Sequence, residues 1–157
     1  MIFVTVGHLN PFDRLVNSVD EWASHHEDVE VFAQIGDSRL KPRHIEWSQF
    51  LEPKEFKEKM ESCDAVVSHA GMGTILTAMQ LGKPVLIMPR QPEEGAQNNH
   101  QIASAEAFSG RGGIMAAMND EEFNVQMGKL HEMMDGDKIS SFASESLIQA
   151  IRDAIDG

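Results

Sequence analysis

Short apolar segments alternate with segments of helical periodicity along the chain. The apolar segments predict strands, and several are β-branched with no polar face, as expected where helices cover both sides of a sheet. These strands are predicted at residues 2–6, 29–35, 45–47, 65–68, 84–88 and 113–116. Helices are predicted between and after them at residues 11–24, 53–62, 74–81, 98–109, 121–134 and 140–155.

Strand–helix alternation with short connections predicts an α/β fold, a doubly wound parallel sheet of Rossmann-like type. Pro11 and Pro53 lie where a first-turn proline is tolerated in a helix. Gly82 follows the end of a predicted helix and is itself followed by Pro84, a common way for a helix to stop. We see no internal repeat, linker or low-complexity segment, so residues 1–157 are expected to form one domain.

The composition of the chain argues against several classes of function. The chain has 157 residues and a formal net charge of −12, which opposes nucleic-acid binding because that function needs a basic face. A lone cysteine, Cys63, excludes an internal disulfide, and its place at the end of a helical pattern favours the core over catalysis. No apolar run reaches the roughly 18 residues of a membrane span, and the opening residues lack the basic flank of a signal peptide. The cytoplasm is therefore the expected location.

A glycine-rich segment connects the strand predicted at 65–68 to the next helix. It runs Ser68-His69-Ala70-Gly71-Met72-Gly73-Thr74, and ligands of parallel sheets bind at the carboxyl ends of the strands. Glycines let backbone amides approach a ligand, and a helix N-terminus carries roughly half a positive charge. These features predict an anion site suited to phosphate, with His69 as a further hydrogen-bond donor. The same residues also fit a tight strand-to-helix turn that binds nothing.

A polar cluster follows the strand predicted at 84–88. Arg90 offers a planar donor fork that suits phosphate or carboxylate. Asn98, Asn99 and Gln101 crowd the start of the next predicted helix with amides that both donate and accept, as sugar hydroxyls require. Helix capping is the alternative role for Asn98.

Two shorter segments complete the predicted ligand edge. Gly7-His8 closes the first strand and is expected beside the glycine-rich segment. Gln34-Ile35-Gly36 closes the second strand. Neither segment is specific by itself.

Taken in order, four segments of the chain resemble glycosyltransferase family 28. They are Val4-Thr5-Val6-Gly7 with Phe12-Asp13-Arg14-Leu15, the segment from Ser68 to Thr74, Gly82-Lys83-Pro84, and Asn99-His100-Gln101. The resemblance extends from about Met1 to Ala103. More narrowly, the chain is similar to small proteins that correspond to the C-terminal domain of that family. These are the bacterial exopolysaccharide glycosyltransferase subunits and the soluble subunit of the dolichol-pathway N-acetylglucosaminyltransferase.

The resemblance implies a fold and an activity. The family fold is GT-B, two Rossmann-like domains facing across a cleft, and this chain would be its C-terminal, donor-binding half. The implied reaction moves a sugar from a UDP-sugar to a lipid-linked or polysaccharide acceptor, with neither a metal nor another cofactor required. A membrane-associated partner subunit is expected to supply the acceptor domain and the general base. That partner would recruit the cytoplasmic chain to the inner face of a membrane.

The resemblance also assigns roles to individual residues. The diphosphate is expected to be surrounded by Gly7, His69, Gly71, Gly73 and Thr74, with His8 and Arg90 adding donors or charge nearby. Asn98, Asn99 and Gln101 would reach the sugar, and Phe50 with Leu51 would lie near the uracil.

Two positions depart from the family pattern. The family carries a carboxylate that grips the ribose hydroxyls on the helix after the glycine-rich segment, and the matching residue here is Thr77. A charge-assisted pair is roughly twice as strong as a neutral hydrogen bond, so ribose recognition is expected to be weaker or rearranged. The family's Gly-Thr after the first strand is Gly7-His8 here. His8 is a conceivable general base because imidazole titrates near neutral pH, although the partner chain is the favoured source.

Two other functions fit parts of the sequence. Thr77 makes a non-catalytic nucleotide-sugar-binding or regulatory module credible. Gly71-Met72-Gly73 also resembles part of a dinucleotide fingerprint, but the third glycine is missing and the following strand ends in Arg90 instead of an acid. NAD is therefore not expected.

Overall fold

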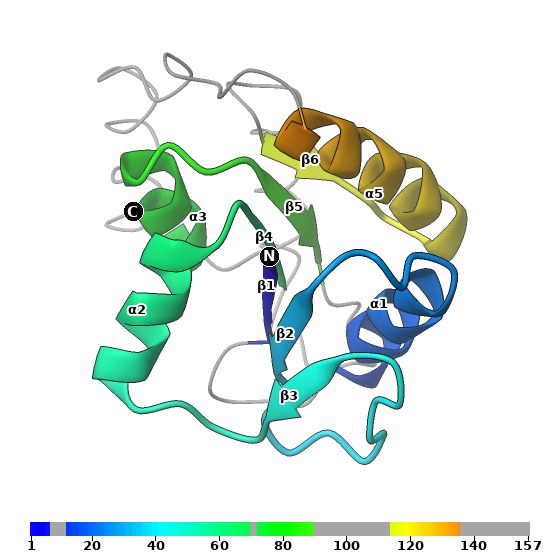
Figure 1. Ribbon diagram of the computed structural model, residues 1–157, viewed down its shortest axis with the longest axis horizontal. Helices are drawn as coiled ribbons and strands as arrows, with labels where there is room; N and C mark the ends of the chain where they lie inside the picture. The colour runs from blue at the N-terminus through cyan, green and yellow to red at the C-terminus, as the bar shows by residue number, and fades with distance from the viewer. Residues whose placement is uncertain (7–11, 70–71, 90–113, 136–157) are drawn as a thin grey trace.

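The computed structural model describes residues 1–6, 12–69, 72–89 and 114–135. Within these ranges, six parallel strands form one sheet in the order β3-β2-β1-β4-β5-β6 (Figure 1). The strands are β1 (Ile2–Thr5), β2 (Val31–Gln34), β3 (Glu46–Ser48), β4 (Ala65–His69), β5 (Val85–Met88) and β6 (Ile114–Ala116). The doubly wound parallel sheet predicted from the sequence is confirmed, and each strand begins and ends within two residues of its predicted bounds.

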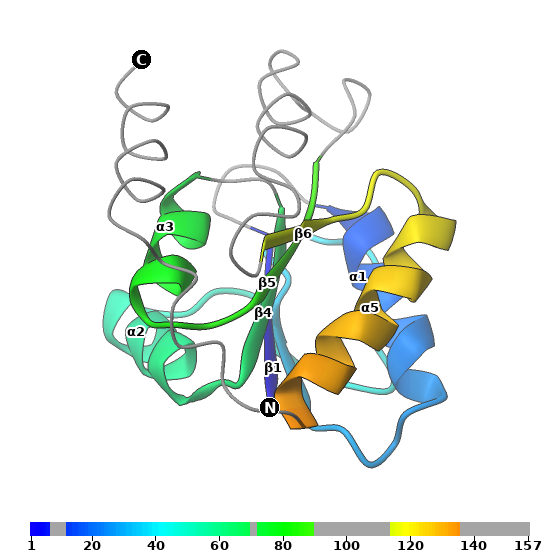
Figure 2. The same cartoon turned by 90° about the horizontal axis from the view of Figure 1, so that it is seen from above.

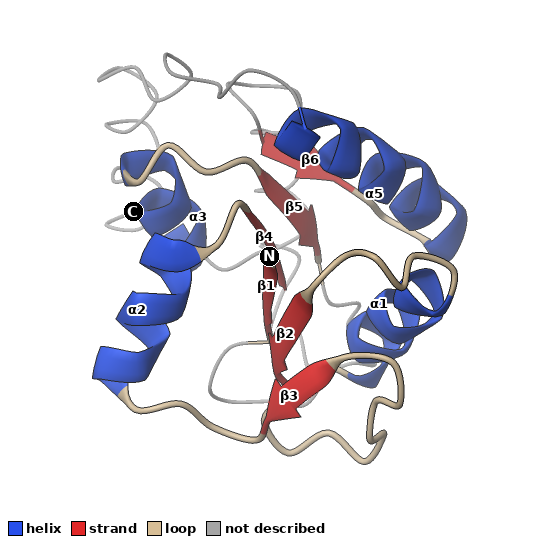
Figure 3. Ribbon diagram, in the orientation of Figure 1, coloured by secondary structure: helices blue, strands red, loops and turns tan. Residues whose placement is uncertain are grey.

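Helices cover both faces of the sheet. Helices α1 (Asp13–Ser24) and α5 (Asp120–Asp135) lie on one face, and α2 (Pro53–Ser62) and α3 (Met72–Gln80) lie on the other (Figures 2 and 3). The prediction for α2 is confirmed at both ends, with Pro53 in its first turn. The helices predicted at 98–109 and 140–155 lie outside the described residues. Among the helices that the structure describes, none combines the length and the apolar character needed to cross a bilayer.

Alternation along the strands divides the core into two layers. Even-numbered residues of β1, such as Ile2 and Val4, pack with the buried stripe of α1, which includes Leu15 and Val19. Phe3, on the opposite side of β1, packs with residues of α2 and α3. Because strand side chains point alternately to opposite faces, the central strands are buried on both sides. Edge strand β3 is the exception, with two of its three residues exposed.

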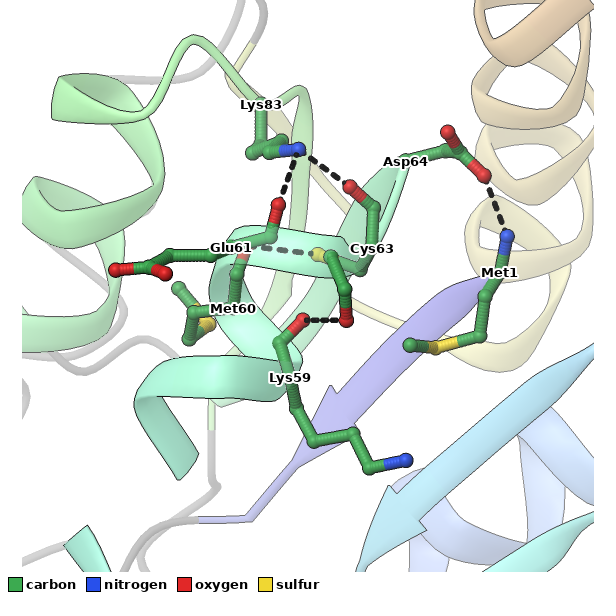
Figure 4. Close-up of polar contacts among 8 residues, drawn as sticks. Met1, Lys59, Met60, Glu61, Cys63, Asp64 and Lys83 are labelled. Carbon is green, nitrogen blue, oxygen red and sulfur yellow. Dashed lines mark hydrogen bonds and ion pairs between the residues drawn. The ribbon is translucent and has the colours of Figure 1, made fainter. Parts of the chain in front are cut away.

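The amino ends of β4 and β5 meet the end of α2 in a compact junction (Figure 4). The Lys83 ammonium donates to the carbonyl of Glu61 at 3.0 Å and to that of Cys63 at 2.6 Å, so it stabilises carbonyls that the end of α2 leaves without helical partners. Gly82 ends α3 with a φ of +71°. Its amide donates to Met79, and the next amide donates to Ala78, which completes a Schellman motif. The predicted helix stop at Gly82 is thus confirmed.

Candidate functional site at the carboxyl edge of the sheet

The direction in which the chain adds strands to the sheet reverses between β1 and β4, which makes this the topological switch point of the sheet. The chain builds outward from β1 to β2 and β3 on one side, and continues from β4 to β5 and β6 on the other. In open α/β sheets, ligands bind outside the carboxyl ends of the strands at this point. The candidate site is therefore built from the ends of β1 and β4 and from the segments that follow them.

A row of buried polar side chains crosses the sheet at this edge. Gln34, Thr5 and Ser68 occupy one register across β2, β1 and β4, and none exposes more than 1% of its surface. The Thr5 hydroxyl donates to Gln34 Oε1 at 3.2 Å. Gln34 Nε2 and Ser68 Oγ have no hydrogen-bond partner in the part of the chain that the structure describes. An unsatisfied buried polar group costs about 1–3 kcal/mol, so this row has the capacity to bind a further polar group beneath the edge.

Sequence reasoning did not identify this row as a unit. It treated Ser68 as part of the glycine-rich segment and Gln34 as part of a non-specific strand end. The available signal is that three apolar strands end in polar residues, one each in β1 and β2 and two in β4. Only the register shows that the three positions are neighbours.

The helix after β4 begins earlier than predicted. Helix α3 starts at Met72 and not at Thr74, so Gly73 and Thr74 belong to its first turn. The first amides of a helix have no partner within it, and they lie at the positive end of its dipole. The prediction that Gly73 precedes the helix is therefore wrong, whereas Thr74 lies in the helix as predicted. The correction adds the Gly73 amide to the helix terminus, which is the part of a helix that binds anions.

Gly73 leaves the approach to this terminus open. The residue is exposed, and a Cβ built on it would meet no atom within 4 Å. Its φ is not among the positive values found at Gly36 and Gly82. Neither packing nor backbone conformation therefore requires glycine at this position. Close approach of a ligand to the backbone is a remaining reason for a residue without a side chain.

Thr77 lies one turn further along α3. Its hydroxyl donates to the Gly73 carbonyl at 2.9 Å, within the helix. The hydroxyl proton is therefore used locally, and the oxygen retains only acceptor capacity for a ligand. A ribose hydroxyl could donate to it, but Thr77 cannot reproduce the bidentate contact of a carboxylate.

His69 ends β4 and is half-buried. It pairs in register with Met88 of β5. Strand alternation places its side chain on the same face as Val67, which packs on the α1 side, whereas α3 covers the other face. A phosphate that contacted both the imidazole and the start of α3 would therefore lie over the edge of the sheet itself.

Phe50 and Leu51 follow β3 at the same edge. Phe50 is 49% exposed, whereas Leu51 is partly buried and packs against the core layer on the α2 and α3 side. The Ser48 hydroxyl donates to the Phe50 carbonyl at 3.0 Å, which holds the turn after the strand. An exposed aromatic ring here is available for stacking with a base. The role of these two residues at the uracil stays a prediction.

Several predicted site residues lie outside the described ranges. They are Gly7, His8, Gly71, Arg90, Asn98, Asn99 and Gln101. Their predicted roles at the diphosphate and the sugar stay predictions.

Cys63 is part of the core and not of the site. It is fully buried at the end of α2, and its thiol donates to the Met60 carbonyl at 3.2 Å. Burial raises the pKa of the Cys63 thiol from 9.0 to about 11. Because the thiolate is the nucleophilic form, this residue is chemically inert near neutral pH, as the sequence pattern predicted.

Comparisons with a family model, with related sequences and with solved structures point to the same protein family. Residues 1–156 match the glycosyltransferase family 28 C-terminal domain. The UDP-N-acetylglucosamine transferase subunit ALG13 of Yarrowia lipolytica is 26% identical over 149 residues, which cover 83% of this chain and 72% of that protein. The NMR solution structure of ALG13 superposes with a TM-score of 0.63 at 20% identity, covering 96% of this chain and 93% of that one.

A longer bacterial relative matches part of this chain. The UDP-N-acetylglucosamine--N-acetylmuramyl-(pentapeptide) pyrophosphoryl-undecaprenol N-acetylglucosamine transferase of Prochlorococcus marinus (strain AS9601) is 32% identical over 83 residues. That match covers 50% of this chain but only 22% of the relative. The family match spans nearly all of the chain, and the sheet has the architecture of the C-terminal half of a GT-B glycosyltransferase. The chain belongs to glycosyltransferase family 28, through the C-terminal domain of that family.

Proposed function

We propose that this chain is the donor-binding subunit of a glycosyltransferase that uses a UDP-sugar. The observation that carries the proposal is the start of α3, where the exposed Gly73 leaves backbone amides open at the switch point of the sheet. An anion of two phosphates matches both the positive end of the helix and the open space beside it. The names of the relatives support the nucleotide, since both are UDP-N-acetylglucosamine transferases.

The acceptor is proposed to be lipid-linked or a polysaccharide. The Prochlorococcus relative is named for an acceptor carried on pyrophosphoryl-undecaprenol, and the Yarrowia relative is named as a subunit. A membrane-associated partner subunit that binds the acceptor is also part of the proposal, supported by the name of the Yarrowia relative as a subunit.

In the reaction, an acceptor hydroxyl oxygen bonds to the anomeric carbon of the sugar. The bond between that carbon and the diphosphate oxygen breaks, and UDP leaves with the electron pair. Negative charge grows on the diphosphate during this step, and fixed backbone amides stabilise it without reorganisation. The amides of Gly73 and Thr74 and the side chain of His69 would provide this stabilisation. The hydroxyl proton passes to a general base, which we assign to the partner chain.

Calorimetric titration of the purified chain tests the nucleotide specificity. We expect UDP and UDP-N-acetylglucosamine to bind at one site per chain, and GDP to bind at least about tenfold more weakly, a difference of about 1.4 kcal/mol. Equal binding of GDP and UDP would contradict the proposed uracil recognition. No binding of any nucleotide would contradict the proposed function as a whole.

A second function, nucleotide-sugar binding without catalysis, is favoured by one observation. The Thr77 hydroxyl donates within α3, at the position where the family has a carboxylate for the ribose. The two functions separate when the chain is mixed with UDP-N-acetylglucosamine, the candidate partner and a lipid-diphosphate acceptor. Release of UDP that requires all components supports the transferase, whereas tight binding without release supports the module.

A further inference from the structure

The buried polar row of β2, β1 and β4 lies on the face of the sheet that α2 and α3 cover (Figure 2). Strand side chains alternate between the two faces, so Ser68 shares a face with Val66, and Thr5 shares one with Phe3. Both Val66 and Phe3 pack with residues of α3. Gln34 pairs in register with Thr5 and therefore lies on the same face. The row is thus on the same side of the sheet as α3, which begins four residues after Ser68.

Unused hydrogen-bonding capacity in this register is confined to the switch point. On the β5 side, Ser68 pairs with Ile87, which is apolar and fully buried. On the β3 side, Gln34 pairs with Ser48, whose hydroxyl already donates to the Phe50 carbonyl. Among the described residues, the unpaired polar groups of the register therefore lie where open α/β sheets bind their ligands.

Two side chains of the row can donate hydrogen bonds to a ligand. The Thr5 hydroxyl bonds to one end of the Gln34 amide, so the Nε2 end, with its two N–H groups, lacks an acceptor within the described ranges. The Ser68 hydroxyl is also without a partner there. Both side chains are at least nine-tenths buried, and a buried donor without an acceptor destabilises the folded chain. Neutral donors on the same side as the positive end of a helix favour an anion.

We propose that the Gln34 amide and the Ser68 hydroxyl are further binding groups for the diphosphate, beneath the amides at the start of α3. This inference rests on the proposed function and adds two side chains to it. The oxygens of a diphosphate carry negative charge, and hydrogen bonds to charged groups are stronger than neutral ones. Neither donor atom is open to water in the structure, so an oxygen has to enter the edge of the sheet to reach them. The new hydrogen bonds offset the cost of that entry.

Ser68→Ala tests the proposal, because the Ser68 hydroxyl should destabilise the chain without ligand and stabilise the complex. Removing an unpaired buried group should leave the midpoint of urea denaturation unchanged or raise it. Calorimetric titration with UDP should show a dissociation constant on the order of 10-fold higher than in the wild type. Inorganic pyrophosphate, which lacks the base and the ribose, should show a loss of affinity of similar size.

Ser18→Ala is the matched control. Ser18 is also buried, but it lies on α1 at the other face of the sheet, and its hydroxyl donates to Asp120 Oδ1 at 3.3 Å. The same substitution therefore removes a hydrogen bond that the chain already makes. Ser18→Ala should lower the midpoint of urea denaturation and leave both dissociation constants as they are in the wild type.

Gln34→Met is a second test of the same site. It keeps a long unbranched side chain at this position but removes the amide. The affinity for UDP and for pyrophosphate should fall as it does in Ser68→Ala. Because this variant also loses the hydrogen bond from Thr5, only its dissociation constants are compared.

Unchanged dissociation constants in Ser68→Ala would overturn the proposal. A loss of stability as large as that of Ser18→Ala would also overturn it, since the hydroxyl would then be bonded without ligand. Weaker binding of UDP without weaker binding of pyrophosphate would assign the row to the nucleoside and reject the diphosphate contact. If Ser68→Ala does not fold, the dissociation constants of Gln34→Met decide in the same way. These outcomes leave the proposed function in place, whereas a wild-type chain that binds neither UDP nor pyrophosphate would contradict both.

Discussion

Gly73 allows the ligand-binding role of α3 to be separated from its stability. Replacing Gly73 with alanine adds one methyl group where no atom lies within 4 Å, in a helix whose backbone accepts any L-residue there. Alanine is favoured over glycine in helices because the unfolded chain loses less conformational entropy on folding. The structure therefore predicts that Gly73→Ala is at least as stable as the wild type. If a phosphate contacts this backbone, however, the same methyl group occupies space that the phosphate needs.

The size of the binding loss follows from the contact that is removed. A hydrogen bond to a charged group contributes about 1.5–3 kcal/mol, and each 1.4 kcal/mol corresponds to about a tenfold change in the dissociation constant. Gly73→Ala is therefore expected to weaken UDP binding roughly 10- to 100-fold, measured by calorimetric titration. Thermal unfolding, followed by circular dichroism, should show no decrease in Tm.

Gly128 supplies the matched control. It lies inside α5, is exposed, and likewise has no atom within 4 Å of a built Cβ. Gly128→Ala should stabilise the protein by about 0.5–1 kcal/mol, raise Tm by roughly 1–4 °C, and leave UDP binding unchanged. If Gly73→Ala binds UDP as tightly as Gly128→Ala does, the Gly73 backbone does not approach the ligand, and the reasoning that makes α3 a phosphate site is refuted.

Three further predictions concern single residues. His69→Ala should weaken UDP binding by about 1.5–3 kcal/mol in the same titration, and an unchanged dissociation constant would show that His69 only forms the turn. Gly82→Ala should lower the free energy of unfolding by roughly 1–2 kcal/mol, since Gly82 has a φ of +71° that L-residues adopt at that cost; urea denaturation measures this, and an unchanged midpoint would contradict it. For Cys63, the folded pKa of about 11 lies above the ordinary value of 9.0, so the unfolded state loses its thiol proton first. The contribution of Cys63 to stability is therefore complete below pH 9 and is lost as the pH rises toward 11. Denaturant titrations across that range should show the difference in unfolding free energy between the wild type and Cys63→Ala becoming smaller as the pH rises.

Local signals in the sequence were sufficient for most of the fold. A proline in the first turn of a helix marks the start of α2 at Pro53, and the prediction there was correct at both ends. The predicted bounds of β3 are one residue early, because they follow the apolar residues of the sequence whereas this edge strand is largely exposed. The prediction for α3 was two residues late, because Gly73 was assigned to a loop although a glycine in a first turn is compatible with a helix.

The site was less accessible to sequence reasoning, because its contacts are between distant residues. At the carboxyl edge, the Arg14 side chain donates to the Pro89 carbonyl, 75 positions away in the sequence, and contacts the Met118 carbonyl, 104 positions away, so no spacing rule connects them. The polar row is also made of residues that are distant in the sequence, since Gln34, Thr5 and Ser68 become neighbours only through the strand order. In contrast, the glycine-rich segment was found because one short stretch of sequence contains both the strand end and the helix start.

Titration of the ¹⁵N-labelled chain with UDP, followed through backbone amide shifts, tests the central claim most directly. That claim is that the first amides of α3 bind the diphosphate. We predict that, among the described residues, the largest saturable changes in amide chemical shift occur at Gly73 and Thr74, and that the amide shifts of α5 do not change. Saturable shifts that leave Gly73 and Thr74 unchanged, or no shifts at millimolar UDP, would contradict the claim.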